Sequence, residues 1–245
     1  MTLQCNRECF FCFNPKPRTA GMSVHGREVG SIKEGVEFLA DLGVRSVGIS
    51  GGEPLLEQRK VLALTCALRR RLGKGLRIDL YTNGDLLSAP LLRRLKTAGV
   101  DGLRLNLAAN GYDTQPVALA RQVFDEVEVE IPAIPEHKDR VEALSVELEE
   151  LGCRHLILHE LFSSAQNVEA LARQGRRAKT GPRPAGLTWS PVAGSEEAAL
   201  EILLKALRRK ARISVYYCST GTQQCIAQRA MRRRPGAGLA AARRS

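Results

Sequence analysis

Short apolar runs alternate regularly with longer amphipathic stretches along much of this chain. The amphipathic stretches repeat apolar residues at helical spacing, and a glycine follows each one where a helix is expected to end. Such strand–helix alternation predicts an α/β fold built on a parallel sheet with right-handed crossovers. The expected strands are Ser46–Ser50, Arg77–Tyr81, Gly102–Leu107, Val127–Ile131 and His155–Leu161; the expected helices are Ser31–Leu42, Arg59–Leu72, Pro90–Ala98 and Asp139–Leu151, ending at Gly43, Gly73, Gly99 and Gly152.

The composition is that of a globular protein without membrane spans. The 245 residues fit one large domain, or one domain with a small appendage, and a hydrophobic content of 44% suffices for a buried core. No apolar stretch approaches the ~20 residues that cross a bilayer, and the start of the chain lacks the apolar region of a signal peptide. The later cysteines show no dense disulfide pattern. We therefore expect a cytoplasmic protein with no membrane partner.

Three cysteines lie close together near the start of the chain. Cys5, Cys9 and Cys12 have the spacing C-x3-C-x2-C. A [4Fe–4S] cluster is ordinarily held by four thiolates, so a loop with three thiolates leaves one iron open for another ligand. Structural zinc usually takes four ligands in two close pairs, and no second pair follows here. The spacing therefore favours an iron–sulfur cluster.

The run Gly51-Gly52-Glu53-Pro54 follows the first of these expected strands. By itself it could be a tight turn in which Pro54 begins a helix. Combined with the cysteine motif, in which Phe11 occupies an aromatic position before Cys12, it resembles the radical S-adenosylmethionine superfamily. The resemblance implies that Cys5, Cys9 and Cys12 hold a [4Fe–4S] cluster, that the open iron chelates S-adenosylmethionine, and that Gly51–Pro54 hold its methionine ammonium group.

The resemblance also implies a fold and a first chemical step. The expected fold is a partial (β/α)6 parallel barrel with an open side and a C-terminal extension, and the segment before Cys5 is its expected first strand. In that family the reduced cluster splits S-adenosylmethionine into methionine and a 5′-deoxyadenosyl radical, which abstracts a hydrogen atom from the substrate. The electron would come from a donor such as flavodoxin or ferredoxin.

Polar residues at the carboxyl ends of the expected strands are further candidates, because ligands of parallel α/β folds bind there. Asn83 could face the nucleoside or simply form a turn with Gly84. Arg104 and Asn106 alternate with leucines, which predicts that both point into the barrel lumen. A buried arginine needs a partner. The S-adenosylmethionine carboxylate or an anionic substrate would serve, and so would Glu53 or another lumen acid, such as Glu128 or Glu130.

The catalytic residues are not identified by any motif. The candidates are His159 and Glu160, at the end of the sixth expected strand, and Cys218. The His–Glu pair could bind the substrate or transfer a proton, or it could be a polar strand edge. Cys218 could be a structural thiol, a ligand of a second cluster or a catalytic thiol, and its exposure would discriminate among these.

The segment Tyr216-Tyr217-Cys218-Ser219 is loosely similar to uncharacterised proteins related to pyruvate formate-lyase activating enzyme. This likeness implies that a glycyl residue of a partner protein is the substrate. Radical modification of RNA or of a small molecule is an alternative. A non-catalytic, metal-stabilised interaction module is another.

The formal net charge of +11 comes almost entirely from the end of the chain. Residues 200–245 contain 11 Lys and Arg but a single acid, Glu201. Such a patch can attract nucleic acid, or it can be a solvated disordered tail. The aromatic content of 4% disfavours a stacking platform for nucleic acid. We expect a core at residues 1–161, an extension at 162–228 and a basic tail at 229–245.

Overall fold

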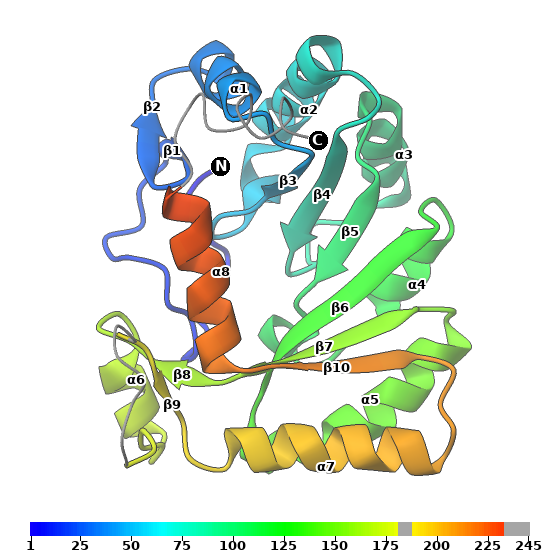
Figure 1. Cartoon of the computed structure of the whole chain (residues 1–245). Helices are drawn as coiled ribbons and strands as arrows, with labels where there is room; N and C mark the ends of the chain where they lie inside the picture. The colour runs from blue at the N-terminus through cyan, green and yellow to red at the C-terminus, as the bar shows by residue number, and fades with distance from the viewer. Residues whose placement is uncertain (181–187, 233–245) are drawn as a thin grey trace, which may run out of the picture.

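A six-stranded, entirely parallel sheet forms the centre of the computed structural model, which describes residues 1–180 and 188–232 (Figure 1). The strand order is β10-β7-β6-β5-β4-β3. This is the predicted α/β architecture. The strands are β3 (Ser46–Ile49), β4 (Arg77–Thr82), β5 (Gly102–Leu105), β6 (Glu126–Ala133), β7 (His155–Glu160) and β10 (Ser214–Cys218).

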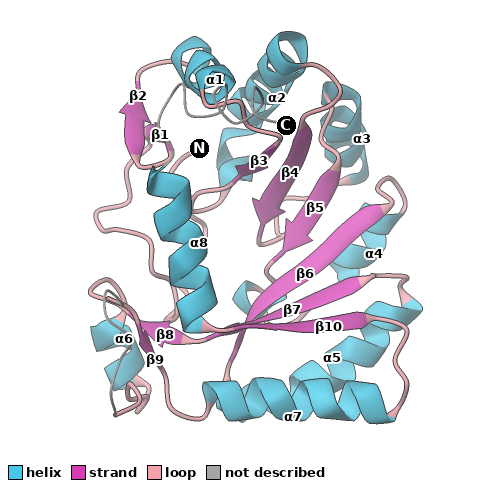
Figure 2. Cartoon of the chain, in the orientation of Figure 1, coloured by secondary structure: helices cyan, strands magenta, loops and turns pink. Residues whose placement is uncertain are grey.

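Alternation along the strands separates an apolar outer face from a polar inner face. In β6, Val127, Val129 and Ile131 are buried in the main hydrophobic cluster, whereas Glu128 and Glu130 point to the opposite face. The outer face is covered by helices (Figure 2). These helices are α1 (Ile32–Asp41), α2 (Gln58–Leu72), α3 (Ala89–Ala98), α4 (Gln115–Arg121), α5 (Lys138–Glu150) and α7 (Ser195–Arg208).

The helix boundaries follow local sequence signals. The Ser31 and Ser88 side chains accept hydrogen bonds from the backbone of the first turns of α1 and α3. Gly99 ends α3 with a φ of 106°, a left-handed conformation that glycine adopts without strain. The four predicted helices are confirmed to within a residue at each end. Helix α4 was not predicted because it is only 7 residues long.

The predicted first strand, before Cys5, is wrong. Residues 1–4 form no strand, although Gly52 N donates to Thr2 O at 2.7 Å and Glu53 N donates to Gln4 O at 2.8 Å. These bonds lie beyond the end of β3, so the segment does not pair with β3 itself. The sixth strand is instead β10, which pairs with β7 at the opposite edge and lies beyond the predicted boundary at residue 161.

The remaining elements surround the inner side of the sheet. Helix α8 (Thr220–Arg232) runs from the end of β10 toward the hairpin of β1 (Met22–Val24) and β2 (Arg27–Val29) (Figure 1). A small module contains α6 (Val168–Arg173) and the antiparallel strands β8 (Phe162–Ser163) and β9 (Ser190–Pro191). The first four residues of the predicted tail are helical, and residues 233–245 lie outside the described residues. None of the described helices is both long and apolar enough to cross a membrane.

Candidate active site

The three cysteines lie on an irregular loop that is fixed to the turn after β4. Asp85 accepts hydrogen bonds from Asn6 Nδ2 at 2.7 Å and from Arg7 Nε at 2.6 Å. Asn83 Nδ2 donates to Asn6 Oδ1 at 2.8 Å. All three thiols are free and partly exposed. The loop is therefore held over the carboxyl ends of the strands, as the sequence predicts.

A cavity of about 480 Å³ opens beneath this loop. The loop, the carboxyl ends of β3 to β7 and helix α8 all contribute to its wall. Most of the predicted site residues line it, whereas Glu53, Pro54 and Cys218 do not. The predicted residues in the wall are Cys5, Cys9, Phe11, Cys12, Gly51, Gly52, Asn83, Arg104, Asn106, His159 and Glu160.

The three thiols line one cavity, as the ligands of a shared cluster would. Among residues 1–180 and 188–232, no three Cys, His, Asp or Glu side chains are placed to hold one metal ion. In a [4Fe–4S] cluster each thiolate binds a different iron, so the thiols need not converge on one point. Burial, together with the neighbouring Cys12 and Cys5, raises the pKa of Cys9 to about 11. A positively charged group would therefore stabilise the thiolates here.

Gly51 and Gly52 allow the chain that leads to Cys5 to pass close to the end of β3. A Cβ atom on Gly51 would lie 2.1 Å from Thr2 O, and one on Gly52 would lie 2.2 Å from Gln4 O. Both distances are too short for atoms that are not bonded. In this structure the two glycines are required by packing between backbones. The resemblance implies a further role for the same segment, which is to hold the methionine ammonium group.

Glu53 is fully buried, and its carboxylate is hydrogen-bonded within the protein. Its carboxylate accepts hydrogen bonds from Leu55 N at 2.9 Å, Thr82 Oγ1 at 2.9 Å and Asn83 N at 2.8 Å. Burial raises the pKa of Glu53, although these hydrogen bonds oppose the shift. Glu53 thus joins the Gly51–Pro54 segment to the turn after β4. Pro54 begins the short helix η1 (Pro54–Glu57), as its position predicts.

Arg104 points into the lumen, as the leucine alternation predicts, and its partners are lumen acids. Arg104 Nη1 contacts Glu130 and lies 2.8 Å from Glu128, and Arg104 Nε lies 3.5 Å from Asp79. Of the partners that the sequence left open, these contacts bear out the lumen acids, and the acids are Glu128 and Glu130 rather than Glu53. Burial lowers the pKa of Arg104, but Tyr81 and these glutamates outweigh burial and raise it.

Asn106 lies one residue past the end of β5. Its backbone N–H donates to Thr82 O at 3.0 Å, while its side-chain Oδ1 is buried and lacks a hydrogen-bond partner among the described residues. Because a buried acceptor without a donor is unfavourable, this atom is a candidate to accept a hydrogen bond from a ligand in the cavity.

His159 lies next to the ion pairs of Arg104. Its Nε2 lies 3.0 Å from Glu130 Oε2. Burial lowers the pKa of His159, but interactions with the Cys218 thiol and Glu130 outweigh burial and raise it to about 9. Cys218 faces His159 directly in the β10–β7 ladder and is only 5% exposed. The Cys218 thiol is therefore buried and is not part of the cavity wall.

Glu160 has a structural role. It follows Leu158 on the outer face of β7 and is 4% exposed. Its Oε2 accepts a hydrogen bond from Thr220 N at 2.7 Å, at the start of α8. On the same helix, Gln223 Nε2 donates to the Glu160 and Cys218 carbonyl oxygens at 3.0 Å each. The predicted His–Glu pair is thus divided between two roles: the His159 imidazole contacts Glu130, whereas the Glu160 carboxylate holds the start of α8.

Several wall residues carry no recognisable motif. Phe13, Phe162 and Trp189 form an aromatic wall, in which the Phe162 and Trp189 rings stack with centroids 4.3 Å apart. Phe13 and Phe162 line the cavity. Phe13 could have been found from the sequence, because it directly follows Cys12. Phe162 and Trp189 are far from the cysteine motif in the sequence and could not be found in this way. Tyr81, which the sequence analysis does not single out, lines the cavity beside Arg104.

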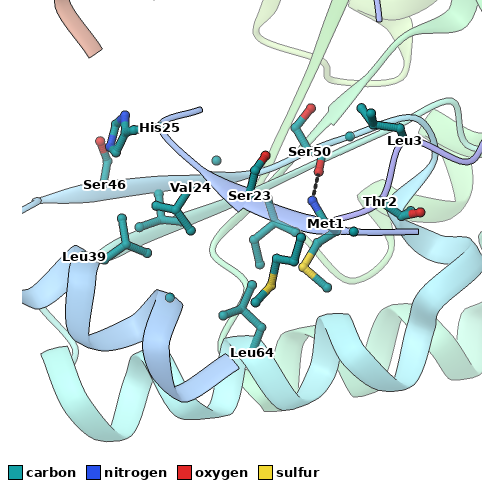
Figure 3. A pocket seen from close by; sticks show the side chains of 17 residues that line it. Met1, Thr2, Leu3, Ser23, Val24, His25, Leu39, Ser46, Ser50 and Leu64 are labelled. Carbon is teal, nitrogen blue, oxygen red and sulfur yellow. Dashed lines mark hydrogen bonds between the residues drawn. The ribbon is translucent and has the colours of Figure 1, made fainter. Parts of the chain in front are cut away.

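A second cavity, of about 360 Å³, lies beside β3 (Figure 3). Val24, Leu39 and Leu64 are among the apolar side chains in its wall. The Met1 ammonium group donates to Ser50 O at 2.6 Å, and burial lowers the pKa of this amine. Gly51 is the only predicted site residue in this wall, so the chemistry is expected at the cysteine loop.

Comparison with protein families identifies the chain. The family model for the radical SAM superfamily matches residues 1–145, which is more than half of the chain. The chain belongs to this superfamily. Radical SAM proteins use a [4Fe–4S] cluster and S-adenosylmethionine, which are the predicted cofactors.

Two curated relatives illustrate the range of similarity within the superfamily. A protein of Methanocaldococcus jannaschii named "Putative glycyl-radical enzyme activating enzyme MJ0021" is 26% identical over 237 residues, which cover 92% of this chain and 60% of the relative. A GTP 3′,8-cyclase of a Synechococcus strain is 35% identical over 119 residues, which cover 48% of this chain and 32% of the cyclase. The chain thus spans less than two thirds of either relative.

Two solved structures of other proteins have a similar fold. SuiB of Streptococcus suis bound to the precursor peptide SuiA matches with a TM-score of 0.63 at 14% identity, over 89% of this chain and 47% of SuiB. The protein anSMEcpe with bound AdoMet and the Cp18Cys peptide matches with a TM-score of 0.55 at 14% identity, over 87% of this chain and 60% of anSMEcpe. These likenesses show the open, partial-barrel fold that the sequence predicts.

Proposed function

We propose that this chain is a radical SAM enzyme that removes a hydrogen atom from a residue of a protein or peptide. Cys5, Cys9 and Cys12 would hold the [4Fe–4S] cluster. When bound, the cluster and S-adenosylmethionine would supply the 5′-deoxyadenosyl radical that abstracts the hydrogen. The observation that carries this proposal is the opening of three free thiols onto the same cavity as the polar strand ends.

The cavity wall suggests how the chain's own residues would bind S-adenosylmethionine. Gly51 and Gly52 would offer backbone groups to its methionine part, and Asn106 Oδ1 would accept a hydrogen bond from it. Phe11 and Asn83 would contribute contacts from the cysteine loop and the turn after β4. Glu53 and Pro54 would act by positioning this backbone, because they are buried and lie outside the wall.

A protein substrate is supported by the relative that matches nearly the whole chain, which is named as an activating enzyme for glycyl-radical enzymes. Two structures of the same fold are complexes with peptides. We therefore propose a glycyl residue of a partner protein as the site of hydrogen abstraction. The electron would come from a flavodoxin or ferredoxin, and the free cysteines suit the reducing cytoplasm.

The decisive experiment is anaerobic cluster reconstitution, followed by incubation with S-adenosylmethionine and dithionite. Iron per chain and 5′-deoxyadenosine are measured for the wild type, for Cys9→Ala and for Cys66→Ala. Cys66 lies on α2, away from the cavity, and is the matched control. We expect the nucleoside from the wild type and Cys66→Ala but not from Cys9→Ala. An intact cluster that never cleaves S-adenosylmethionine would instead favour the interaction module.

A small-molecule substrate is the second candidate, because a cyclase relative is 35% identical over the 119 residues that it matches, whereas the activating-enzyme relative is 26% identical over 237 residues. GTP added to the reconstituted protein distinguishes the two. A GTP-derived product together with increased 5′-deoxyadenosine would favour this candidate. Transfer of deuterium into 5′-deoxyadenosine from a protein labelled with deuterated glycine would favour the protein substrate.

A further inference from the structure

Helix α7 exposes a stripe of leucines on the side that faces away from the sheet. Leu200, Leu204 and Leu207 have exposed fractions of 46%, 47% and 65%. Their spacing of four and then three residues is the d-a-d spacing of a coiled-coil seam. An apolar seam of this kind is typical of a helix that packs against another helix.

The opposite side of α7 is already packed. Ala198, Ala199, Ile202 and Ala206 are buried on the sheet side of the helix. On a flank between these two sides, Glu201 and Lys205 form ion pairs with α5. The helix is therefore apolar on two sides, which is characteristic of helices buried on both sides. Nothing among the described residues covers the outer side.

The charges at the ends of α7 are complementary. Glu196 and Glu197 lie in its first turn, whereas Arg208 and Lys210 lie at and just beyond its end. All four residues are partly or fully exposed, and Glu196 and Glu197 share Lys179 as their partner within the chain. In an antiparallel pair of such helices, the acidic end of each helix would lie beside the basic end of the other.

We propose that two copies of this chain associate through antiparallel packing of α7 about a two-fold axis near Leu204. Leu204 then meets the same residue of the second copy, and Leu200 packs near Leu207. A two-fold contact of this kind uses the same patch on both copies, so one stripe is sufficient. Antiparallel packing also places opposite helix dipoles side by side.

The proposed dimer leaves both active sites free. Helix α7 lies on the outer face of the sheet, whereas the cysteine loop and α8 lie on the inner side (Figure 1). The contact is small: the stripe contains three leucines, whereas stable interfaces bury about 1,200–2,000 Å². The dimer is therefore expected to form in a concentration-dependent manner.

Sedimentation velocity over a range of concentrations tests the pairing. We expect a monomer–dimer equilibrium for the wild type, and for Leu204→Lys a dissociation constant raised at least about tenfold. Val168→Lys is the matched control, because Val168 is 48% exposed and lies on α6. A monomeric wild type at every concentration, or a dimer that is equally sensitive to both variants, would overturn the proposal.

A charge exchange tests the antiparallel arrangement. Glu197→Lys and Arg208→Glu are each expected to weaken the dimer, and the double variant is expected to restore it. Glu197 and Arg208 lie at opposite ends of one helix, so rescue requires contact between two copies. A double variant weaker than both single variants would contradict the antiparallel arrangement. Circular dichroism confirms that each variant is folded.

Discussion

His159 Nε2 donates a hydrogen bond to Glu130 Oε2 at 3.0 Å across the neighbouring strands β7 and β6. Glu130 also accepts from Arg104 on β5, so one carboxylate is shared by two cationic groups. Burial raises the pKa of Glu130, but these two partners outweigh burial and lower it. The lumen is therefore a charged network in which each ion is partly neutralised by a neighbour.

This network predicts a pH dependence of stability. The pKa of His159 in the folded protein, about 9, lies above the usual histidine value of 6.5, so its contribution to stability is fully present below about pH 6.5 and is lost as the pH rises through 9. We expect the free energy of unfolding to fall by about 3 kcal/mol across this range. Urea unfolding at several pH values measures it.

His159→Gln is expected to remove most of this dependence. His155→Gln is the control, because His155 lies at the other end of the same strand and is exposed. Equal pH profiles for the wild type and His159→Gln would contradict the assignment.

Much of this network could be predicted from the sequence, because side chains along a strand alternate between the two faces of the sheet. This alternation placed Arg104, Glu128 and Glu130 on one face correctly. The same alternation also separates His159 from Glu160, because Glu160 shares its face with Leu158. The two residues were grouped by their adjacency in sequence, and strand geometry points their side chains in opposite directions.

Contacts between distant segments could not be predicted in this way. β10 joins the sheet by pairing with β7, although more than fifty residues separate them, and the aromatic wall combines Phe13 with Phe162 and Trp189. The structural reason for glycine at positions 51 and 52 could not be predicted either, because the atoms that lie too close for a side chain belong to the Thr2 and Gln4 backbone. Local patterns specify faces and helix ends, whereas these features depend on tertiary packing.

Substitution of Gly52 by alanine is expected to displace the segment that leads to Cys5. The new Cβ would lie 2.2 Å from Gln4 O, and relief of this clash requires backbone movement. We expect a loss of about 1–3 kcal/mol in stability and less iron after reconstitution. Gly75→Ala is the control, since a Cβ there meets nothing within 4 Å. Normal iron content in Gly52→Ala would show that the close backbone approach is not needed.

Glu53→Gln is expected to destabilise the turn after β4. Leu55 N and Asn83 N donate to different oxygens of the Glu53 carboxylate, and glutamine has only one acceptor oxygen, so one of these backbone groups loses its acceptor. A buried donor without an acceptor costs about 1–3 kcal/mol, which chemical unfolding would detect. Glu57→Gln, at the other end of the short helix that Glu53 caps and only half-buried, should be near neutral. A Glu53→Gln protein as stable as the wild type would argue that the Glu53 carboxylate is dispensable for this turn.

Asn167 connects the cysteine loop to the aromatic wall, so its removal is expected to loosen both. Its Nδ2 donates to Phe11 O at 3.2 Å and to Phe162 O at 3.0 Å, and the residue is 1% exposed. Asn167→Ala leaves these buried carbonyl groups without a donor, and we expect less iron per chain and a loss of about 1–3 kcal/mol. Trp189 is the single tryptophan of the chain and stacks on Phe162, so its fluorescence reports the wall directly. A changed emission spectrum in Asn167→Ala, with Gln166→Ala unchanged, is the expected result. An unaltered spectrum with full iron content would mean that the loop and the wall are held independently of Asn167.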